Sequence, residues 1–233
     1  MKKKIKIKSI LLCLLIILIL FLIGWYIFKA RIKNIYVIGN NYLKEIDIIE
    51  EANLIFYPKI IDINTSNIEK KLEGNDLIEK AKVTKNYFGK VMIEIDEKEI
   101  LFKDNANNYY LDNGKIITNP KIEIVVPSLI KEMPNNDILD KFIRKYNKID
   151  KDIRLKISEI EYAKDNLDNE KFLFYMYDGN YVYITLSKIE LMNSYNDIYV
   201  QLGDNHGILY LDSGNHFQIK NNDTLNEIIE NNE

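Results

Sequence analysis

The sequence predicts an α+β protein: a single N-terminal transmembrane helix, then a β-α-α-β-β unit, then a mixed β domain with packed helices. Two observations lead to this fold class. Residues Ile10 to Phe28 form an uncharged run of nineteen positions near the start of the chain. After it, polar sequence dominates, and the apolar positions follow the spacing of amphipathic helices in some stretches and of half-buried strands in others.

The uncharged run is long enough to cross a membrane. A helix over residues 10–28 spans roughly 28 Å, close to the thickness of the hydrocarbon core. Fifteen of its nineteen residues are Leu, Ile or Phe, which favours insertion by about 5 to 9 kcal/mol. A cleaved secretion signal is the alternative, but it needs small residues where this run has Trp25 and Tyr26. We therefore expect an uncleaved anchor over residues 10–28, after a basic tail over residues 1–9.

The charges that flank the run predict its orientation. Five lysines precede it, and three cations follow it at Lys29, Arg31 and Lys33. The excess of positive charge places the N-terminus in the cytoplasm and the body outside, as a single-pass type II protein. Residues 34–233 hold 24 Lys and Arg against 35 Asp and Glu, and this negative balance argues against nucleic-acid binding. The only cysteine, Cys13, lies in the span, so the body holds no intrachain disulfide.

The apolar pattern of residues 32–98 predicts the first unit, the β-α-α-β-β unit. A short apolar run from Ile32 to Ile38 predicts a strand that ends in a turn at Gly39-Asn40. The residues from Leu43 to Leu54 predict an amphipathic helix, with its apolar face at Ile46, Ile49 and Ala52.

A second helix is expected to begin at Ser66, where Ser66 and Glu69 form the S-x-x-E pattern of a capping box, and to end at Gly74. Two alternating stretches then predict strands, one with Ala81 and Val83 inward and one with Val91, Ile93 and Ile95 inward. The predicted order is β-α-α-β-β.

The sequence pattern of residues 99–217 predicts the mixed β domain. The pattern indicates a strand around Tyr109–Leu111 that ends in a turn, then a helix from Ile138 to Ile149 with Leu139, Phe142, Ile143 and Tyr146 on one face. Three further strands are expected at residues 157–163, 172–177 and 181–186. A helix over residues 188–202 and a closing strand over residues 207–214 follow. The polar residues 218–233 are expected to form a C-terminal tail.

The order of these features resembles the FtsQ/DivIB family of bacterial cell-division proteins. The start of that family's POTRA domain is an apolar strand, Gly-Asn and an acidic amphipathic helix. The matching positions here are Val37, Gly39, Asn40, Glu45 and Ile46. The resemblance implies a POTRA domain over residues 32–98 and an FtsQ/DivIB-type β domain over residues 99–217. Where many members carry Glu-Arg-x-Pro after the last POTRA strand, this chain reads Glu97-Lys98-Glu99-Ile100.

The residues that could carry chemistry do not form a recognisable set. A metal site needs three or four converging ligands, whereas His206 and His216, the only histidines, flank a predicted strand and are held apart by it. Asp212-Ser213-Gly214 lacks the surroundings of a nucleophile motif and indicates a turn after a strand. We therefore expect no catalytic residue, no metal and no cofactor, and a protein that is not an enzyme.

The closing strand carries the remaining functional signal. A last strand followed by a polar tail can lie at a sheet edge, where unpaired backbone groups accept a strand from another chain. The alternative is that Tyr210 and Phe217 only pack on the body. The family resemblance implies that this strand and the segment after it receive a coiled-coil partner. The positions carried over are Ile208, Tyr210, Asp212, Gly214 and Phe217.

The resemblance implies a function as well as a fold. We expect a non-enzymatic, membrane-anchored scaffold of the divisome that binds other single-span division proteins outside the cytoplasmic membrane during septum formation. The implied partners are coiled-coil proteins of the FtsB/DivIC and FtsL type, and septal peptidoglycan synthases are further candidates. The alternatives are a membrane-anchored POTRA adaptor in protein transport or, less favoured, an extracytoplasmic enzyme that acts on the wall. The expected location is the cytoplasmic membrane at the division septum.

Overall fold

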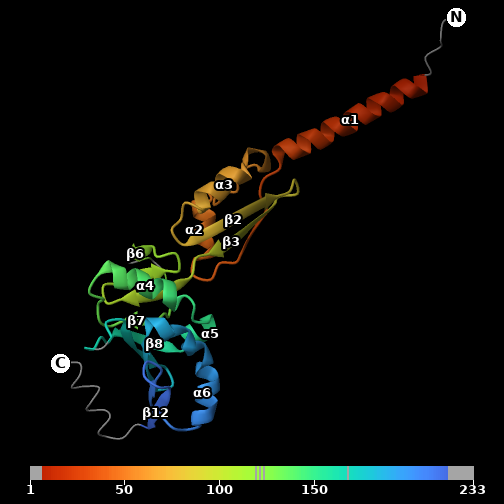
Figure 1. The fold of residues 1–233 in the computed structure, drawn as a ribbon. Coiled ribbons are helices and arrows are strands. Elements are labelled where there is room, and N and C mark those ends of the chain that lie inside the picture. The colour runs from red at the N-terminus through yellow and green to blue at the C-terminus, as the bar shows by residue number, and fades with distance from the viewer. Residues whose placement is uncertain (1–6, 119, 121, 123, 167, 220–233) are drawn as a thin grey trace, which may run out of the picture. The chain divides into compact units, whose positions relative to one another are not determined.

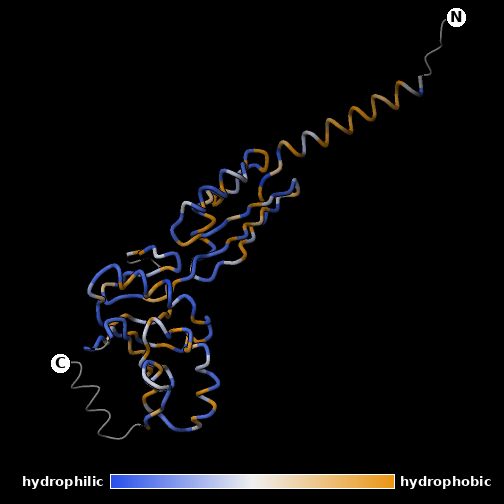
Figure 2. The backbone as a smooth tube through the Cα atoms, in the orientation of Figure 1, coloured by the Kyte–Doolittle hydropathy of each residue, from blue (hydrophilic) through white to orange (hydrophobic). Residues whose placement is uncertain are grey.

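The computed structural model describes residues 7–118, 120, 122, 124–166 and 168–219 and divides into two compact units, Met1–Glu97 and Lys98–Glu233 (Figure 1). The first unit begins with helix α1 (Ile7–Lys29). Its stretch Ile10–Lys29 is long and apolar enough to cross a membrane, and none of it is buried by the rest of the protein. Figure 2 shows the apolar colour along almost the whole helix. The predicted apolar N-terminal helix is confirmed.

A three-stranded sheet follows in the first unit. Its strands are β1 (Asn34–Ile38), β2 (Ile78–Lys85) and β3 (Lys90–Glu97), in the order β1-β3-β2. Strand β1 runs parallel to β3, and β2 runs antiparallel to it. Between β1 and β2 the chain forms α2 (Glu45–Glu51), the 3₁₀ helix η1 (Ile60–Asp62) and α3 (Thr65–Leu72). The predicted order β-α-α-β-β is confirmed.

The core of this unit lies between the helices and one face of the sheet. Val91, Ile93 and Ile95 alternate inward from β3, as predicted, and are at most 3% exposed. They meet Ile48 from α2 and Leu72 from α3 in one apolar cluster. Alternation with a period of two on β3 and a spacing of four on the helices thus produce a core one layer thick.

Two details of the predicted helices are wrong. Ile46 is 52% exposed and Ile48 is the buried residue of α2 in its place, whereas Ala52, at the end of the helix, is buried as predicted. Helix α3 begins one residue before Ser66, and its cap is Asn64, whose Oδ1 accepts the Asn67 N–H. An Asn at this position satisfies one free N–H group as well as Ser does.

The Glu69 side chain, which the capping-box prediction directs to the helix start, contacts the sheet instead. Its Oε1 accepts the Val83 N–H at 2.8 Å, and one turn later the Glu73 Oε1 accepts the Ala81 N–H at 3.2 Å. Since β2 is an outer strand of the sheet, these two carboxylates occupy N–H groups on the side of β2 that has no partner strand among the described residues.

The second unit is built on a nine-stranded sheet. Its order is β12-β11-β10-β9-β8-β7-β4-β5-β6. Most neighbours are antiparallel, but β7 runs parallel to both β4 and β8, and β10 runs parallel to β11. The strands are β4 (Ile100–Asp104), β5 (Asn108–Leu111), β6 (Ile116–Thr118), β7 (Ser128–Leu129), β8 (Ile157–Tyr162), β9 (Lys171–Met176), β10 (Tyr181–Thr185), β11 (Gly207–Tyr210) and β12 (His216–Ile219).

Helices cover one face of this sheet and enclose an aromatic core. They are α4 (Asn136–Tyr146), α5 (Lys151–Arg154), the 3₁₀ helix η2 (Leu186–Ser194) and α6 (Tyr195–Leu202). The Phe142 ring of α4 lies 5.5 Å from the Phe102 ring of β4 and 4.5 Å from the Phe172 ring of β9. The predicted inward face of α4 is confirmed, whereas the single helix predicted over residues 188–202 is a 3₁₀ helix followed by an α-helix.

The predicted position of the closing strand at a sheet edge is wrong. Strand β11 is paired on both sides, with β10 and with β12. The outermost strand is β12, which includes residues 218 and 219 of the predicted polar tail. Residues 220–233 lie outside the described residues. Strand β12 holds only four residues, His-Phe-Gln-Ile, and an alternation this short does not identify a strand from the sequence.

Candidate functional site

The candidate site is the end of the nine-stranded sheet, formed by β11, β12 and the turn between them. Backbone groups of successive residues point to opposite sides of a strand. The N–H groups of Gly207 and Leu211 donate towards β10, to Asn180 Oδ1 and Tyr183 O. The alternation therefore directs the backbone groups of Ile208 and Tyr210 towards β12.

The same argument applies to β12. Ile208 lies opposite Gln218, and Tyr210 lies opposite His216, so Gln218 and His216 direct their backbone groups towards β11. The N–H and C=O groups of Phe217 and Ile219 then point away from the sheet. No strand pairs with this outer side among the residues that the structure describes. An edge of this kind can accept a strand from another chain.

A stack of rings supports the open face of this sheet end. The Tyr210 ring lies 4.5 Å from the His216 ring with an interplanar angle of 8°, and 5.5 Å from the Tyr183 ring. The Tyr210 hydroxyl donates to Gln218 Oε1 at 3.2 Å. Three neighbouring strands are thereby held together by one row of side chains.

An ion pair holds the start of the turn. The Lys171 Nζ lies 2.9 Å from Asp212 Oδ2 and 3.0 Å from Asp165 Oδ2, and the Asp212 side chain is only 8% exposed. The ammonium also lies 4.7 Å from the centre of the Tyr183 ring. Burial lowers the pKa of Lys171, but its hydrogen bonds to the two carboxylates outweigh burial and raise the pKa above its usual value.

The other predicted partner-binding residues lie around this pair with different exposures. Ile208 is 2% exposed and therefore unavailable for direct contact. Gly214 has φ = +88° in the exposed turn, a conformation that favours glycine. Phe217 is half-buried and packs against the apolar core beside Leu209. The structure brings the five predicted residues into one hairpin, but it exposes only part of them.

A groove runs beside the hairpin on the helical side. It encloses about 350 Å³ and is bordered by Leu191, Ile198 and Leu202 of the helices and by Phe217 of β12. Its lining is mostly apolar. A strand added to β12 can therefore bury apolar side chains on this face in addition to its backbone hydrogen bonds.

The predicted POTRA motif has structural roles in the first unit. Gly39 has φ = +90°, and a Cβ there would lie 2.0 Å from the Ile95 carbonyl oxygen. The Asn40 Nδ2 donates to the Leu43 carbonyl at 3.0 Å. Val37 packs against the core, and Glu45 starts helix α2, where a carboxylate interacts favourably with the helix dipole. Ile46, the fifth motif residue, is exposed as described above.

Glu97 completes this turn, a role that the sequence pattern does not predict. Its carboxylate accepts the N–H groups of Asn41 and Tyr42 at 2.8 Å and of Leu43 at 2.9 Å. Three consecutive N–H groups bound to one carboxylate fix the path from β1 into α2. The local signal for Glu97 is its position as the last residue of the alternating strand β3.

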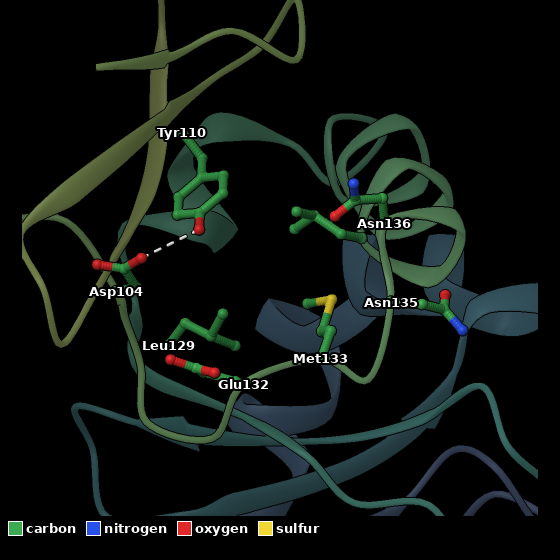
Figure 3. Close-up of a pocket in the computed structure, with 8 residues that line it drawn as sticks. Asp104, Tyr110, Leu129, Glu132, Met133, Asn135 and Asn136 are labelled. Atoms are coloured by element: carbon green, nitrogen blue, oxygen red, sulfur yellow. Dashed lines mark hydrogen bonds between the residues drawn. The ribbon is translucent and has the colours of Figure 1, made fainter. Parts of the chain in front are cut away.

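A separate polar pocket of about 250 Å³ lies between β4, β5 and α4 (Figure 3). Asp104 and Glu132 border it, and the Tyr110 hydroxyl donates to Asp104 Oδ2 at 3.0 Å. Burial raises the pKa of Asp104, but hydrogen bonds from Asn108, Tyr110 and Ala106 together lower it below its usual value. A general acid at neutral pH needs the opposite shift, so these bonds give Asp104 a structural role.

Neither histidine gathers metal ligands. Within the described part of the chain, no group of three or more His, Cys, Asp or Glu side chains could hold a metal ion. His216 stacks on Tyr210, as described above, and His206 is exposed just before β11.

Comparisons with known proteins agree on one family. Residues 30–98 match the FtsQ-type POTRA domain. The chain is 30% identical over 224 residues to the cell division protein DivIB of Listeria monocytogenes, covering 93% of this chain and 83% of that protein. It is 25% identical over 195 residues to DivIB of Bacillus subtilis, covering 81% and 74%.

Among solved structures, the extracytoplasmic domain of DivIB from Geobacillus stearothermophilus matches 46% of this chain and 95% of its own, with 17% identity and a TM-score of 0.38. This structural similarity is low, so the assignment rests on the relatives in sequence.

Proposed function

The chain belongs to the DivIB family of cell division proteins, and from this membership we propose that it is a membrane-anchored scaffold of the bacterial divisome. Helix α1 anchors the chain, with the N-terminus in the cytoplasm and both compact units outside. The scaffold has no reaction of its own. It binds other single-span division proteins, of the FtsB/DivIC and FtsL coiled-coil type, at the division septum.

The outer edge of β12 is the observation that carries the proposal. It offers outward N–H and C=O groups at Phe217 and Ile219, next to an apolar groove of about 350 Å³. A partner segment that adds as a further strand gains backbone hydrogen bonds from the edge and side-chain contacts from the groove. Of the predicted partner-binding residues, Phe217 contacts the partner, and Tyr210, Asp212 and Gly214 hold the hairpin in place. Ile208 is buried and makes no direct contact.

Anchoring in one bilayer makes modest contacts sufficient. Two proteins tethered to the same membrane meet at a raised effective concentration, so the complex gains affinity without any additional contact. A scaffold with a weak edge-strand site can therefore hold its partners while both span the same membrane.

Two substitutions at Ile219 test the strand addition. Ile219 is 55% exposed, and its N–H points outward, so Ile219→Pro removes an edge donor without removing a hydrogen bond inside the sheet. Ile219→Ala shortens the same side chain and keeps the N–H. We expect Ile219→Pro to weaken capture of the co-expressed coiled-coil division protein at least tenfold, and Ile219→Ala to weaken it by less than threefold.

Equal capture by the wild type and by Ile219→Pro would contradict the strand addition. Location is tested separately, with a fluorescent protein fused to the N-terminus and imaged in dividing cells. A band at mid-cell supports the divisome role, and uniform envelope labelling throughout the cycle contradicts it.

A further inference from the structure

Two tight turns of the first unit carry large apolar side chains at their tips. The Tyr57 N–H donates to the Leu54 carbonyl at 3.0 Å, which closes a turn around Ile55 and Phe56. The Gly89 N–H donates to the Asn86 carbonyl at 3.3 Å, which closes a turn around Tyr87 and Phe88. Phe56 is 88% exposed and Phe88 is 76% exposed. Turn tips normally carry Gly, Pro, Asn, Asp or Ser, so two tips of this composition require a reason.

Both turns are attached to the segment that directly follows α1. Ile32 donates its N–H to the Pro58 carbonyl at 3.1 Å, and the next residue, Lys33, donates to the Gly89 carbonyl at 2.7 Å. The Ile60 N–H donates to the Ala30 carbonyl at 2.9 Å. Since α1 ends at Lys29, each turn is bonded to residues within four positions of the apolar helix. The two tips are thus held where the chain leaves the membrane.

The turns are also stiff. The Asn86 Oδ1 accepts the Phe88 N–H at 3.0 Å and the Lys90 N–H at 3.1 Å. On the other turn, Leu54 and Ile60 are buried on either side of the exposed tip. Little conformational entropy is therefore lost when the tips are immobilised against another surface.

We propose that these two turns insert their tips into the lipid headgroup region, so that the first unit rests on the outer membrane surface at two points besides the span. Tyr is favoured at the membrane–water interface, where one end of its ring is apolar and the other wet, and the Phe rings beside it gain from burial at the boundary between headgroups and acyl chains.

The charges around the turns fit the same surface. Arg31, Lys33 and Lys90 are exposed, Lys59 is half-buried, and the Arg31 guanidinium donates to the Tyr57 carbonyl at 3.4 Å. Cations at this depth attract anionic lipid headgroups. The occupant is therefore a lipid surface. The inference rests on the anchoring by α1 in the proposed function, and it adds a fixed position of the first unit above the bilayer.

Fluorescence quenching in a membrane of known composition tests the contact. The full chain with Cys13→Ala receives one cysteine, at Tyr87 in the turn or at Glu79, which is exposed at the other end of β2, roughly 20 Å from Lys85. Each variant carries an environment-sensitive fluorophore. The variants are placed, one copy each, in nanodiscs of phosphatidylcholine and phosphatidylglycerol that contain a lipid with a shallow spin-label quencher. We expect quenching at position 87 to be at least threefold greater than at position 79.

Two double variants, each with the label at position 87, assign the quenching to the tips. Phe56→Ser with Phe88→Ser is expected to lower the quenching at least twofold. The matched control, Tyr36→Ser with Ile38→Ser, removes two exposed apolar side chains from β1 and is expected to leave it unchanged. Equal quenching at positions 87 and 79, or no response to the tip variant, would overturn the proposal.

Two further outcomes separate the alternatives. The same measurement is made in discs that hold two copies. If the fluorophore at position 87 is shielded from water only in these discs, the tips contact a second copy, and the proposal is overturned. Resistance to alkaline extraction is measured in parallel. A chain that is extracted contradicts the anchor itself, whereas a chain that resists extraction and shows no quenching contradicts only the contact of the turns.

Discussion

The pair of Lys171 with Asp212 provides the sharpest test of how the β11–β12 hairpin is held. The change is Lys171→Met, which keeps the length and apolar stem of the side chain and removes its charge. Asp212, with a side chain 8% exposed, then loses the cation at 2.9 Å. We expect the hairpin to open locally more often, because a buried carboxylate that has lost its cation favours the open state in which water reaches it.

The magnitude follows from the surroundings. Removal of one partner from a fully buried pair costs about 3 to 5 kcal/mol. Here the Lys171 side chain is 16% exposed, so water reaches the pair. The Lys188 ammonium also donates to the Asp212 backbone carbonyl at 2.6 Å, so a second cation lies nearby. Both effects reduce the cost. Loss of the contact with the Tyr183 ring adds a smaller part. We expect about 2 kcal/mol, or roughly a 30-fold rise in local opening.

Hydrogen exchange of the full chain in nanodiscs measures this opening directly. The N–H groups of Leu211 and Asp212 both donate to the Tyr183 carbonyl, so their exchange reports the attachment of the hairpin to β10. The control is Lys171→Met combined with Asp212→Asn, in which no buried charge remains. Its exchange is expected to lie within about fivefold of the wild type.

Two results would refute the reasoning. The first is exchange of Leu211 and Asp212 in Lys171→Met within threefold of the wild type. The second is a double variant that exchanges as fast as Lys171→Met alone, because the cost would then come from lost packing and not from an unpaired charge.

Three further predictions concern local features of both units. Glu97→Gln should raise amide exchange in the turn after β1 roughly 30-fold, about 2 kcal/mol, because a neutral amide replaces a carboxylate that accepts three N–H bonds. Asn64→Ala should destabilise α3 by about 1 kcal/mol, measured by exchange, while Ser66→Ala should cost a few tenths at most. The pKa of Tyr110 is raised to about 12, first by burial and then by Asp104. Asp104→Asn should therefore lower that pKa in a phenolate titration, yet leave it above its ordinary value.

The sign of the Tyr110 effect on stability also follows. With its pKa raised in the folded state, the unfolded chain releases the phenol proton first as the pH rises. The stability that Tyr110 contributes is complete below a pH of about 10 and is lost as the pH rises towards 12. Tyr110→Phe should make the alkaline loss of stability smaller than in the wild type, and an unchanged loss would contradict the assignment to Tyr110.

Local signals in the sequence were sufficient for most elements and for the inward faces. The alternation of Val91, Ile93 and Ile95 and the spacing of Phe142 and Tyr146 report burial directly, because side-chain direction follows the period of the element. The failures concern choices between similar residues a few positions apart. Asn64 and Ser66 both suit a helix cap, and only the tertiary position of Glu69 at the edge of β2 decides between them.

The candidate site was predictable in composition but not in arrangement. The residues named from the closing strand do lie in one hairpin, yet which strand forms the edge depends on pairing between distant segments. Strand β12 is too short to show a pattern, so nothing local distinguishes it from a tail. Lys171 was missed for the same reason, since its partner Asp212 lies 41 positions away in the sequence.

The carboxylates of Glu69 and Glu73 have a consequence for the solubility of the first unit. An outer strand of eight residues, such as β2, is a template on which identical copies can pair and aggregate. By accepting the N–H groups of Val83 and Ala81, the two acids remove two of the outward donors that such pairing needs and place negative charge beside the edge. The POTRA unit of this chain can therefore be concentrated without assembling through β2. Replacement of both acids by alanine would turn the same strand into a site of self-association.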